Sequence, residues 1–273
     1  MIENTDFLSV IHHPLRPNTP EYIQMLFPDF IEMHGDRFYG DDLSVIGGIA
    51  SFKGVAVTVI GHVKGRNLEE RLRCNFSMSK PEGYRKILRL MKQAEKFRRP
   101  VICFVDTMGA YPGKEAEERG QGNAIANCLA EAVGLRTQVI SILLGDGGSG
   151  GALALCIADY LIALEHATLG VISPRACANI LWKDSTRERE AAEFLHMNAQ
   201  SLYEFGVVDQ IIEEPNEGAH TDPQIVADRL AEIIGKELKR LTGVPVGRLV
   251  RKRKRKYREI GSQFLLRSKD TGR

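Results

Sequence analysis

The stretch VICFVDTMGAYPG, residues 101–113, decides the fold, and a second segment, QVISILLGDGGSGGALA at 138–154, has the same organisation. In each, an uninterrupted apolar run ends in a glycine-rich loop, and a helical pattern follows. Apolar runs of this length and β-branched content are typical of strands buried on both faces. Strand, turn and helix in alternation predict an α/β fold, with a parallel sheet covered by helices and binding sites beyond the carboxyl ends of its strands.

The flanking sequence extends this pattern in both directions. Two short β patterns at 44–52 and 55–63 are separated by Lys53-Gly54, which indicates a tight hairpin. Residues 81–98 repeat apolar side chains at i+3 and i+4, which predicts an amphipathic helix. Its polar face is expected to carry Arg85, Lys86, Arg89, Lys92 and Lys96. Further helices are expected near 20–34 (kinked or broken at Pro28), 117–133, 150–158, 184–205 and 223–241, and strands near 160–164 and 207–212.

Composition and charge describe an ordinary globular chain with a basic end. The sequence is 43% hydrophobic and 26% charged, with a net charge of +2, and residues 248–258 hold eight Lys or Arg and no acid. We therefore divide the chain into a body, residues 1–245, and a basic C-terminal helix or tail, residues 246–273. A solvated terminal helix that meets an acidic partner subunit is favoured over nucleic-acid binding, because Tyr257 is the only aromatic residue in the basic run.

The cysteines and the N-terminus favour a cytoplasmic location. Five cysteines are scattered singly without C-x-x-C spacing, as in a reduced protein. The first residues lack the apolar core of a secretory signal, and no run reaches the roughly 18–20 apolar residues of a membrane span. The seven histidines show no metal-ligand spacing, so no metal site is expected.

Two loops could carry chemistry, DTMGAYPG at 106–113 and GDGGSGGALA at 145–154. Each follows a predicted buried strand and precedes a predicted helix. Glycine lets backbone N–H groups approach a ligand closely, and the free N–H groups of a helix start suit a developing negative charge. Together the loops could form an oxyanion site. The alternative is that each loop is a tight turn in which glycine serves close packing alone.

A different chemistry is also consistent with the second loop. Residues 147–151 (GGSGG) fit G-x-S-x-G, the turn that carries the nucleophile of α/β hydrolases. Ser149 would then be the nucleophile of a serine hydrolase, with Asp209 and His220 in a permitted chain order. Glycines on both sides of Ser149 suit an anion-binding loop equally well, so the motif alone does not distinguish a serine nucleophile from an anion-binding loop.

Several motifs together resemble the carboxyltransferase alpha subunit of bacterial multisubunit acetyl-CoA carboxylase, over about residues 12–220. They are HPLRP, GDRFYGDD, VIGGIASFKG, IGHVKGR, NFSMSKPEGYRKILRLMKQAEKF, FVDTMGAYPG, AEERGQGNAIA, GDGGSGGALAL and VISPRACANILWK. The resemblance implies a crotonase-like spiral of ββα units and an α2β2 assembly with a beta subunit that carries zinc and holds acetyl-CoA. It also implies a biotin carboxyl carrier protein that presents carboxybiotin, a separate biotin carboxylase, and malonyl-CoA as product for fatty acid biosynthesis.

The resemblance also implies roles for individual residues. Gly150 and Gly151 would supply the backbone N–H groups of the oxyanion hole for carboxybiotin, and Gly109, Ala110, Gly148 and Ser149 would bind substrate. No metal or covalently bound cofactor is implied on this chain. Two departures stand out: Met108 occupies the place of the usual proline, and Arg175 that of the usual glutamate. The change at Arg175 leaves open the alternative that the chain is a non-catalytic paralogue of the alpha subunit.

Overall fold

The computed structural model describes residues 7–262, and in that range one mixed sheet holds seven strands in the order β1 to β7. The hairpin at Lys53-Gly54 is confirmed, with its two strands antiparallel, and from β3 to β7 all neighbours are parallel. The strands are β1 (Ile31–Glu32), β2 (Val45–Phe52), β3 (Val55–His62), β4 (Val101–Thr107), β5 (Val139–Gly147), β6 (Tyr160–Leu164) and β7 (Gln210–Ile212). β4 is buried throughout, as its apolar sequence predicts.

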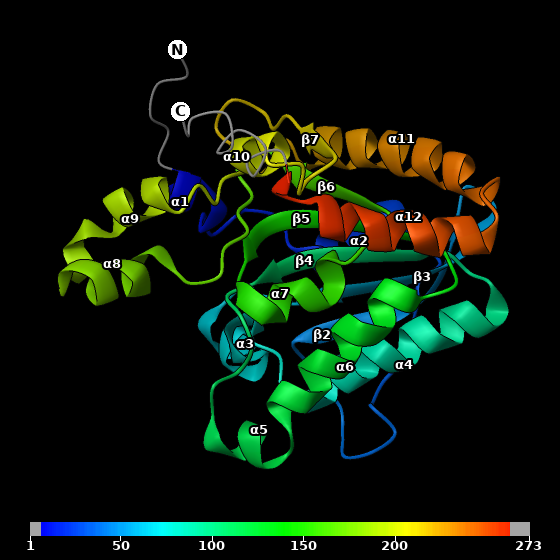
Figure 1. Ribbon diagram of the computed structural model, residues 1–273, viewed down its shortest axis with the longest axis horizontal. Helices are drawn as coiled ribbons and strands as arrows, with labels where there is room; N and C mark the ends of the chain where they lie inside the picture. The colour runs from blue at the N-terminus through cyan, green and yellow to red at the C-terminus, as the bar shows by residue number, and fades with distance from the viewer. Residues whose placement is uncertain (1–6, 263–273) are drawn as a thin grey trace, which may run out of the picture.

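Helices cover both faces of this sheet (Figure 1). α4 (Pro81–Phe97), α6 (Gln121–Gly134) and α7 (Ser149–Cys156) lie on one face, and α2 (Thr19–Leu26) and α11 (Pro223–Thr242) on the other. The pair α8 (Pro174–Trp182) and α9 (Glu188–Phe194) projects from the body. The remaining helices are α1 (Phe7–Ile11), α3 (Leu68–Arg73), η1 (Asn75–Ser77), α5 (Lys114–Glu118), η2 (Ser185–Arg187), α10 (Ala199–Glu204) and α12 (Val246–Glu259).

Three predicted helices are shorter than the sequence pattern indicates. The first ends at Leu26, two residues before Pro28, and β1 follows it. The helix expected over 117–133 is two helices, because Gly120 adopts a left-handed φ of 82° between α5 and α6. The segment 184–205 is divided among η2, α9 and α10, with Asn198 capping α10 by accepting from the Ser201 N–H.

The predicted polar face of α4 is wrong at Lys86. Its side chain is buried, and the Nζ atom donates to the Val45 carbonyl at 2.8 Å and pairs with Asp41 Oδ1 at 2.9 Å. A lysine can extend through an apolar layer and place its ammonium beside a carboxylate, which a helical period does not reveal. Lys86 therefore fastens α4 to β2 and to the loop before it.

The basic helix α12 is not solvated throughout, which corrects the expectation for this segment. Arg253 is buried and donates to Asp159 at 2.5 and 3.0 Å and to the carbonyls of Ala132, Leu135 and Thr137 at the end of α6. The Tyr257 hydroxyl donates to the Cys156 carbonyl at 2.9 Å and accepts from the Ala158 N–H at 2.7 Å. One face of α12 thus packs on the body.

We expect Tyr257→Phe to lower the free energy of unfolding by about 1 kcal/mol, because a typical buried hydrogen bond contributes that much and the ring remains. Urea denaturation of the full chain measures the change. Tyr203→Phe serves as the control, since that side chain is half exposed. An equal effect in both variants would show that the hydroxyl of Tyr257 does not anchor α12.

A buried ion pair fastens the N-terminal segment to the sheet. Arg16 donates to both carboxylate oxygens of Glu214 at 2.6 and 2.7 Å and to the Leu144 carbonyl of β5 at 2.7 Å. Burial by itself raises the pKa of Glu214, but hydrogen bonds from His166 and Arg16, together with the Arg16 charge, lower it to about 2. The pair connects the HPLRP motif to the strand that leads into the second glycine loop.

Acid should therefore destabilise the protein through Glu214. A carboxylate whose folded pKa is depressed contributes stability above its ordinary pKa, and this contribution is lost as pH falls from about 4.5 to about 2. We expect Glu214→Gln to make the unfolding free energy less dependent on pH in this window. Chemical denaturation at several pH values tests this, with the exposed Glu118→Gln as control. An unchanged pH slope in Glu214→Gln would contradict the assignment.

Candidate functional site

The two glycine loops meet at the carboxyl ends of β4 and β5. The Gly148 N–H donates to the Thr107 carbonyl at 2.8 Å. A Cβ atom on Gly148 would lie 2.2 Å from the Met108 oxygen, and one on Gly151 would lie 2.7 Å from the Ala110 nitrogen. Both glycines are therefore required for close packing of one loop on the other. The structure thus brings together all six residues predicted for this site.

The start of α7 leaves backbone donors without protein acceptors. The Ser149 N–H donates to the Gly170 carbonyl at 2.8 Å, and the Gly148 carbonyl accepts from the Ala152 N–H. In the described part of the chain, the N–H groups of Gly150 and Gly151 have no acceptor. The N–H groups of a first helical turn carry partial positive charge. This is the local chemistry of an anion site.

The surroundings of these two donors differ. Gly150 is half-buried, and a Cβ atom there would meet only the Ile125 side chain, at 3.7 Å. Gly151 is buried, and its Cβ position lies 2.8 Å from the Tyr84 hydroxyl, which has no hydrogen-bond partner among the described residues. Gly150 is therefore the more open of the two positions, and Gly151 the one enclosed by protein.

A cluster of charged side chains that the sequence did not indicate supports the second loop. Lys64, just beyond β3, lies 3.1 Å from Asp106 Oδ1 and 2.7 Å from Asp146 Oδ2. The same Asp106 oxygen accepts from the Asp146 N–H at 3.0 Å, and His12 Nε2 lies 3.1 Å from the Asp146 carboxylate. Asp146 is within the glycine loop, between Gly145 and Gly147. We call Lys64, Asp106, Asp146 and His12 the ionic cluster.

Burial strengthens the interactions within the ionic cluster. Burial alone raises the pKa of Asp146, but the hydrogen bond to His12 and the Lys64 charge outweigh it and lower that pKa to about 2. Burial disfavours the charged form of Lys64, yet the charges of Asp106 and Asp146 raise its pKa above the ordinary value. Lys64 and Asp146 therefore stay charged at neutral pH, and their contacts tie the loop to β3 and β4.

The serine hydrolase alternative is wrong, because the predicted triad is not assembled. Ser149 follows the carboxyl end of β5, whereas Asp209 precedes β7 and accepts from the Leu161 N–H near the amino end of β6. Since these strands are parallel, the two residues lie at opposite edges of the sheet. Asp209 pairs with Lys256, and His220 stacks on His13 with ring centroids 3.7 Å apart.

The two departures from the family pattern lie at exposed positions. The Met108 side chain is 59% exposed, while its carbonyl packs against Gly148. Arg175 is exposed in the first turn of α8, outside the two loops.

Residues 7–262 contain no group of three or more His, Cys, Asp or Glu side chains placed to hold a metal ion. No helix in the same range is long and apolar enough to cross a membrane.

Comparison with solved structures confirms the predicted crotonase-like fold. The heterodimer of a Pseudomonas malonate decarboxylase contains a chain with a TM-score of 0.68 and 21% identity, covering 91% of this chain and 97% of that one. The transcarboxylase 12S subunit matches with a TM-score of 0.64 and 18% identity, over 84% of this chain and 45% of that one. Outside the named strands, the described residues also form isolated bridges, among them Gly148 to Gly170 and Ser79 to Ala110.

Sequence comparisons identify the family. The model for acetyl coenzyme A carboxylase carboxyltransferase-like proteins matches residues 1–261. The acetyl-coenzyme A carboxylase carboxyl transferase subunit alpha of Bacillus cytotoxicus is 52% identical over 256 residues, which are 94% of this chain and 79% of that protein. The resemblance seen in the motifs is thus confirmed over nearly the whole chain, and the chain belongs to the acetyl-CoA carboxylase carboxyltransferase family, with its relatives among the alpha subunits.

Proposed function

We propose that this chain is the alpha half of a two-subunit carboxyltransferase that moves a carboxyl group from carboxybiotin to acetyl-CoA and forms malonyl-CoA, the committed step of fatty acid biosynthesis. The observation that carries the proposal is the pair of N–H groups at Gly150 and Gly151, which have no acceptor in the described residues. They lie where two glycine loops meet, in a chain whose relatives are named carboxyl transferase alpha subunits.

Backbone groups perform the proposed catalysis. Carboxybiotin, presented by the biotin carboxyl carrier protein, supplies the carboxyl group. The Gly150 and Gly151 N–H groups donate to its ureido oxygen and stabilise the negative charge that grows there as the carboxyl group leaves. Gly109, Ala110, Gly148 and Ser149 come from the same two loops, which pack on each other, and in this proposal they bind substrate. Such preorganised donors are held by the packing of the loops, so the chemistry requires no side-chain nucleophile from this chain.

The remaining components belong to partner proteins. We propose an α2β2 assembly in which the beta subunit carries zinc and holds acetyl-CoA, while a separate biotin carboxylase charges the carrier with carbon dioxide. This division is supported by the names of the relatives, which are called subunit alpha. We propose the cytoplasm as the site of action, where the carrier and acetyl-CoA would be available.

The direct test removes one N–H group of the loop. Gly150 has a negative φ and is the second residue of α7, where proline is tolerated. Ser149 before it has a φ of 54°, and proline restricts the preceding residue, so an unchanged thermal midpoint of the variant must show that the loop is intact. We expect Gly150→Pro to lower carboxyl transfer by about 100-fold, the effect of losing one oxyanion donor. Gly150→Ala keeps the donor and should retain most activity. The assay is malonyl-CoA-dependent carboxylation of biocytin by the chain co-expressed with its beta subunit.

Controls separate catalysis from assembly. Each subunit alone should be inactive, and Gly150→Pro should still copurify with the beta subunit. Equal activity of Gly150→Pro and Gly150→Ala would overturn the role of the donor. A stable complex that shows no activity in the unchanged chain would favour the non-catalytic paralogue that the charge at Arg175 leaves open.

A further inference from the structure

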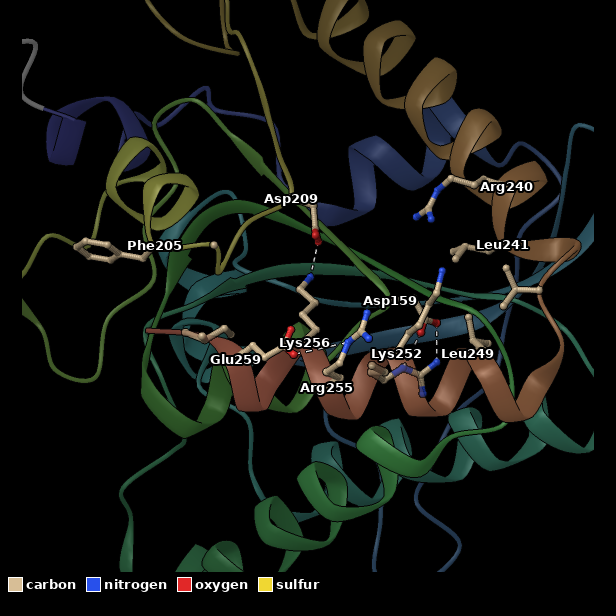
Figure 2. A pocket seen from close by; sticks show the side chains of 14 residues that line it. Asp159, Phe205, Asp209, Arg240, Leu241, Leu249, Lys252, Arg255, Lys256 and Glu259 are labelled. Carbon is tan, nitrogen blue, oxygen red and sulfur yellow. Dashed lines mark hydrogen bonds and ion pairs between the residues drawn. The ribbon is translucent and has the colours of Figure 1, made fainter. Parts of the chain in front are cut away.

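A groove lies at the edge of the sheet opposite the glycine loops. It is formed by α12, the end of α11 and the turn before β7, and its volume is about 440 Å³ (Figure 2). Asp159 and Asp209, which line it, precede β6 and β7 and so mark the amino ends of these strands. The glycine loops lie at the carboxyl ends, so the groove is separate from the proposed active site.

Cationic side chains enter this groove from two helices. Figure 2 shows Arg240 extending from α11 and Lys252 extending from α12 into the space between the helices. The Arg240 guanidinium stacks over the Tyr160 ring at 5.5 Å and pairs with Glu237 through Nε, which leaves its terminal nitrogens available. Lys252 has no carboxylate partner among the described residues. Lys252 is thus a cation without a carboxylate partner in the described residues, and the Arg240 guanidinium, paired through Nε alone, reaches into the same space.

The carboxylates that line the groove are already engaged. Asp159 binds the buried Arg253, and Asp209 pairs with Lys256. Arg255, which also lines the groove, contacts Glu259 at 3.7 Å on the same helix. The remaining lining is apolar and comes from Leu241, Val244, Leu249 and Ile260. The groove therefore has more cations than carboxylates, with Lys252 as the unpaired charge, beside an apolar wall, and an anion placed there would be attracted to it.

We propose that this groove binds a small molecule that carries a diphosphate group. Arg and Lys are the side chains that bind phosphate oxygens best, and donors from two helices can contact two linked phosphates at once. The volume is within the range of small-molecule sites, about 300–1,000 Å³, and the apolar wall can hold the organic part of such a ligand. This site is additional to the proposed carboxyl transfer and does not depend on it.

Calorimetric titration of the full chain with inorganic pyrophosphate tests the proposal. We expect binding to the unchanged chain, and about tenfold weaker binding in Arg240→Gln and in Lys252→Gln, as when about 1.4 kcal/mol is lost. Arg258→Gln is the matched control, because it removes the same charge from the same helix outside the groove lining. It should bind pyrophosphate within about twofold of the unchanged chain. Thermal unfolding confirms that all three variants are folded.

Two further titrants distinguish the sources of a diphosphate. ADP or coenzyme A should bind more tightly than pyrophosphate if its organic part contacts the apolar wall, and that binding should also weaken in Lys252→Gln. The tighter of the two identifies the ligand class. Absence of pyrophosphate binding to the unchanged chain would overturn the proposal. An equal loss in Arg258→Gln would do so too, because it would show a general basic surface and no built site.

Discussion

Replacing Lys64 with methionine should lower the free energy of unfolding by about 3–5 kcal/mol, the effect of removing one partner from a buried ion pair. The side chain of Lys64 is 19% exposed and those of Asp106 and Asp146 are 5% and 16% exposed, so water can do little to replace the ammonium. Two adjacent carboxylates would remain, and their repulsion would act on the second glycine loop itself. Carboxyl transfer should fall together with stability.

The comparison with Lys92→Met tests whether the losses of stability and activity come from the position of Lys64 or from the removal of any lysine charge. Lys92 pairs with Glu131 on the surface, where its side chain is 44% exposed, and exposed ion pairs contribute about 0–1 kcal/mol. Urea denaturation gives both free energies, and the biocytin assay gives both activities. If Lys64→Met were as stable and as active as Lys92→Met, the ionic cluster would have no role in holding the loop.

The ionic cluster should also respond to pH. The pKa of Asp146 is lowered to about 2, so the stability it contributes is present above its ordinary pKa near 4 and is lost as pH falls toward 2. In Asp146→Asn we expect a smaller dependence of stability on pH in this window. Denaturation at a series of pH values measures it, and a slope equal to that of the unchanged chain would show that the Asp146 carboxylate is not stabilised in the fold.

Much of the fold could be predicted because its signals are local. The apolar run at 101–107, the Lys53-Gly54 hairpin and the periodicity of 81–98 each specify an element from neighbouring residues alone. The predictions were wrong where a contact between distant segments determines whether a charged side chain is buried. Lys86 occupies a polar helical position, but a carboxylate from the loop before β2 lets it be buried. Arg253 similarly is buried because Asp159 and the end of α6 offer acceptors.

The same difference between local patterns and long-range contacts explains which residues of the candidate site could be predicted and which could not. Glycine density in consecutive residues pointed to both loops, and the family resemblance pointed to Gly150 and Gly151 as the donors. Lys64 and Asp146 are 82 residues apart, and His12 and Asp146 are 134 apart, so their proximity leaves no local pattern. The one available signal was an acid within a glycine run, at Asp146. The motif around Ser149 misled for a related reason, because chain order permitted a triad that sheet topology does not form.

The second large effect is expected at Gly148. A Cβ atom there would lie 2.2 Å from the Met108 oxygen and 2.7 Å from the Gly109 nitrogen, so Gly148→Ala forces the two loops apart. Overpacking of this kind costs about 1–3 kcal/mol of stability. A shift of about 1 Å in a catalytic group can reduce rate by roughly 100-fold. We therefore expect Gly148→Ala to be nearly inactive in the biocytin assay while remaining largely folded.

Gly122→Ala is the matched control, because a Cβ atom on this glycine of α6 meets nothing within 4 Å. Gly122 is the second residue of α6, where alanine gains less over glycine than the about 0.5–1 kcal/mol of a helix interior, so this variant should be at least as stable and fully active. Near-normal activity of Gly148→Ala would mean that the packing of the loops does not set the position of the Gly150 and Gly151 donors. Loss of both stability and activity only at Gly148 would show that close packing and oxyanion binding, the two explanations of the glycine loops, are parts of one arrangement.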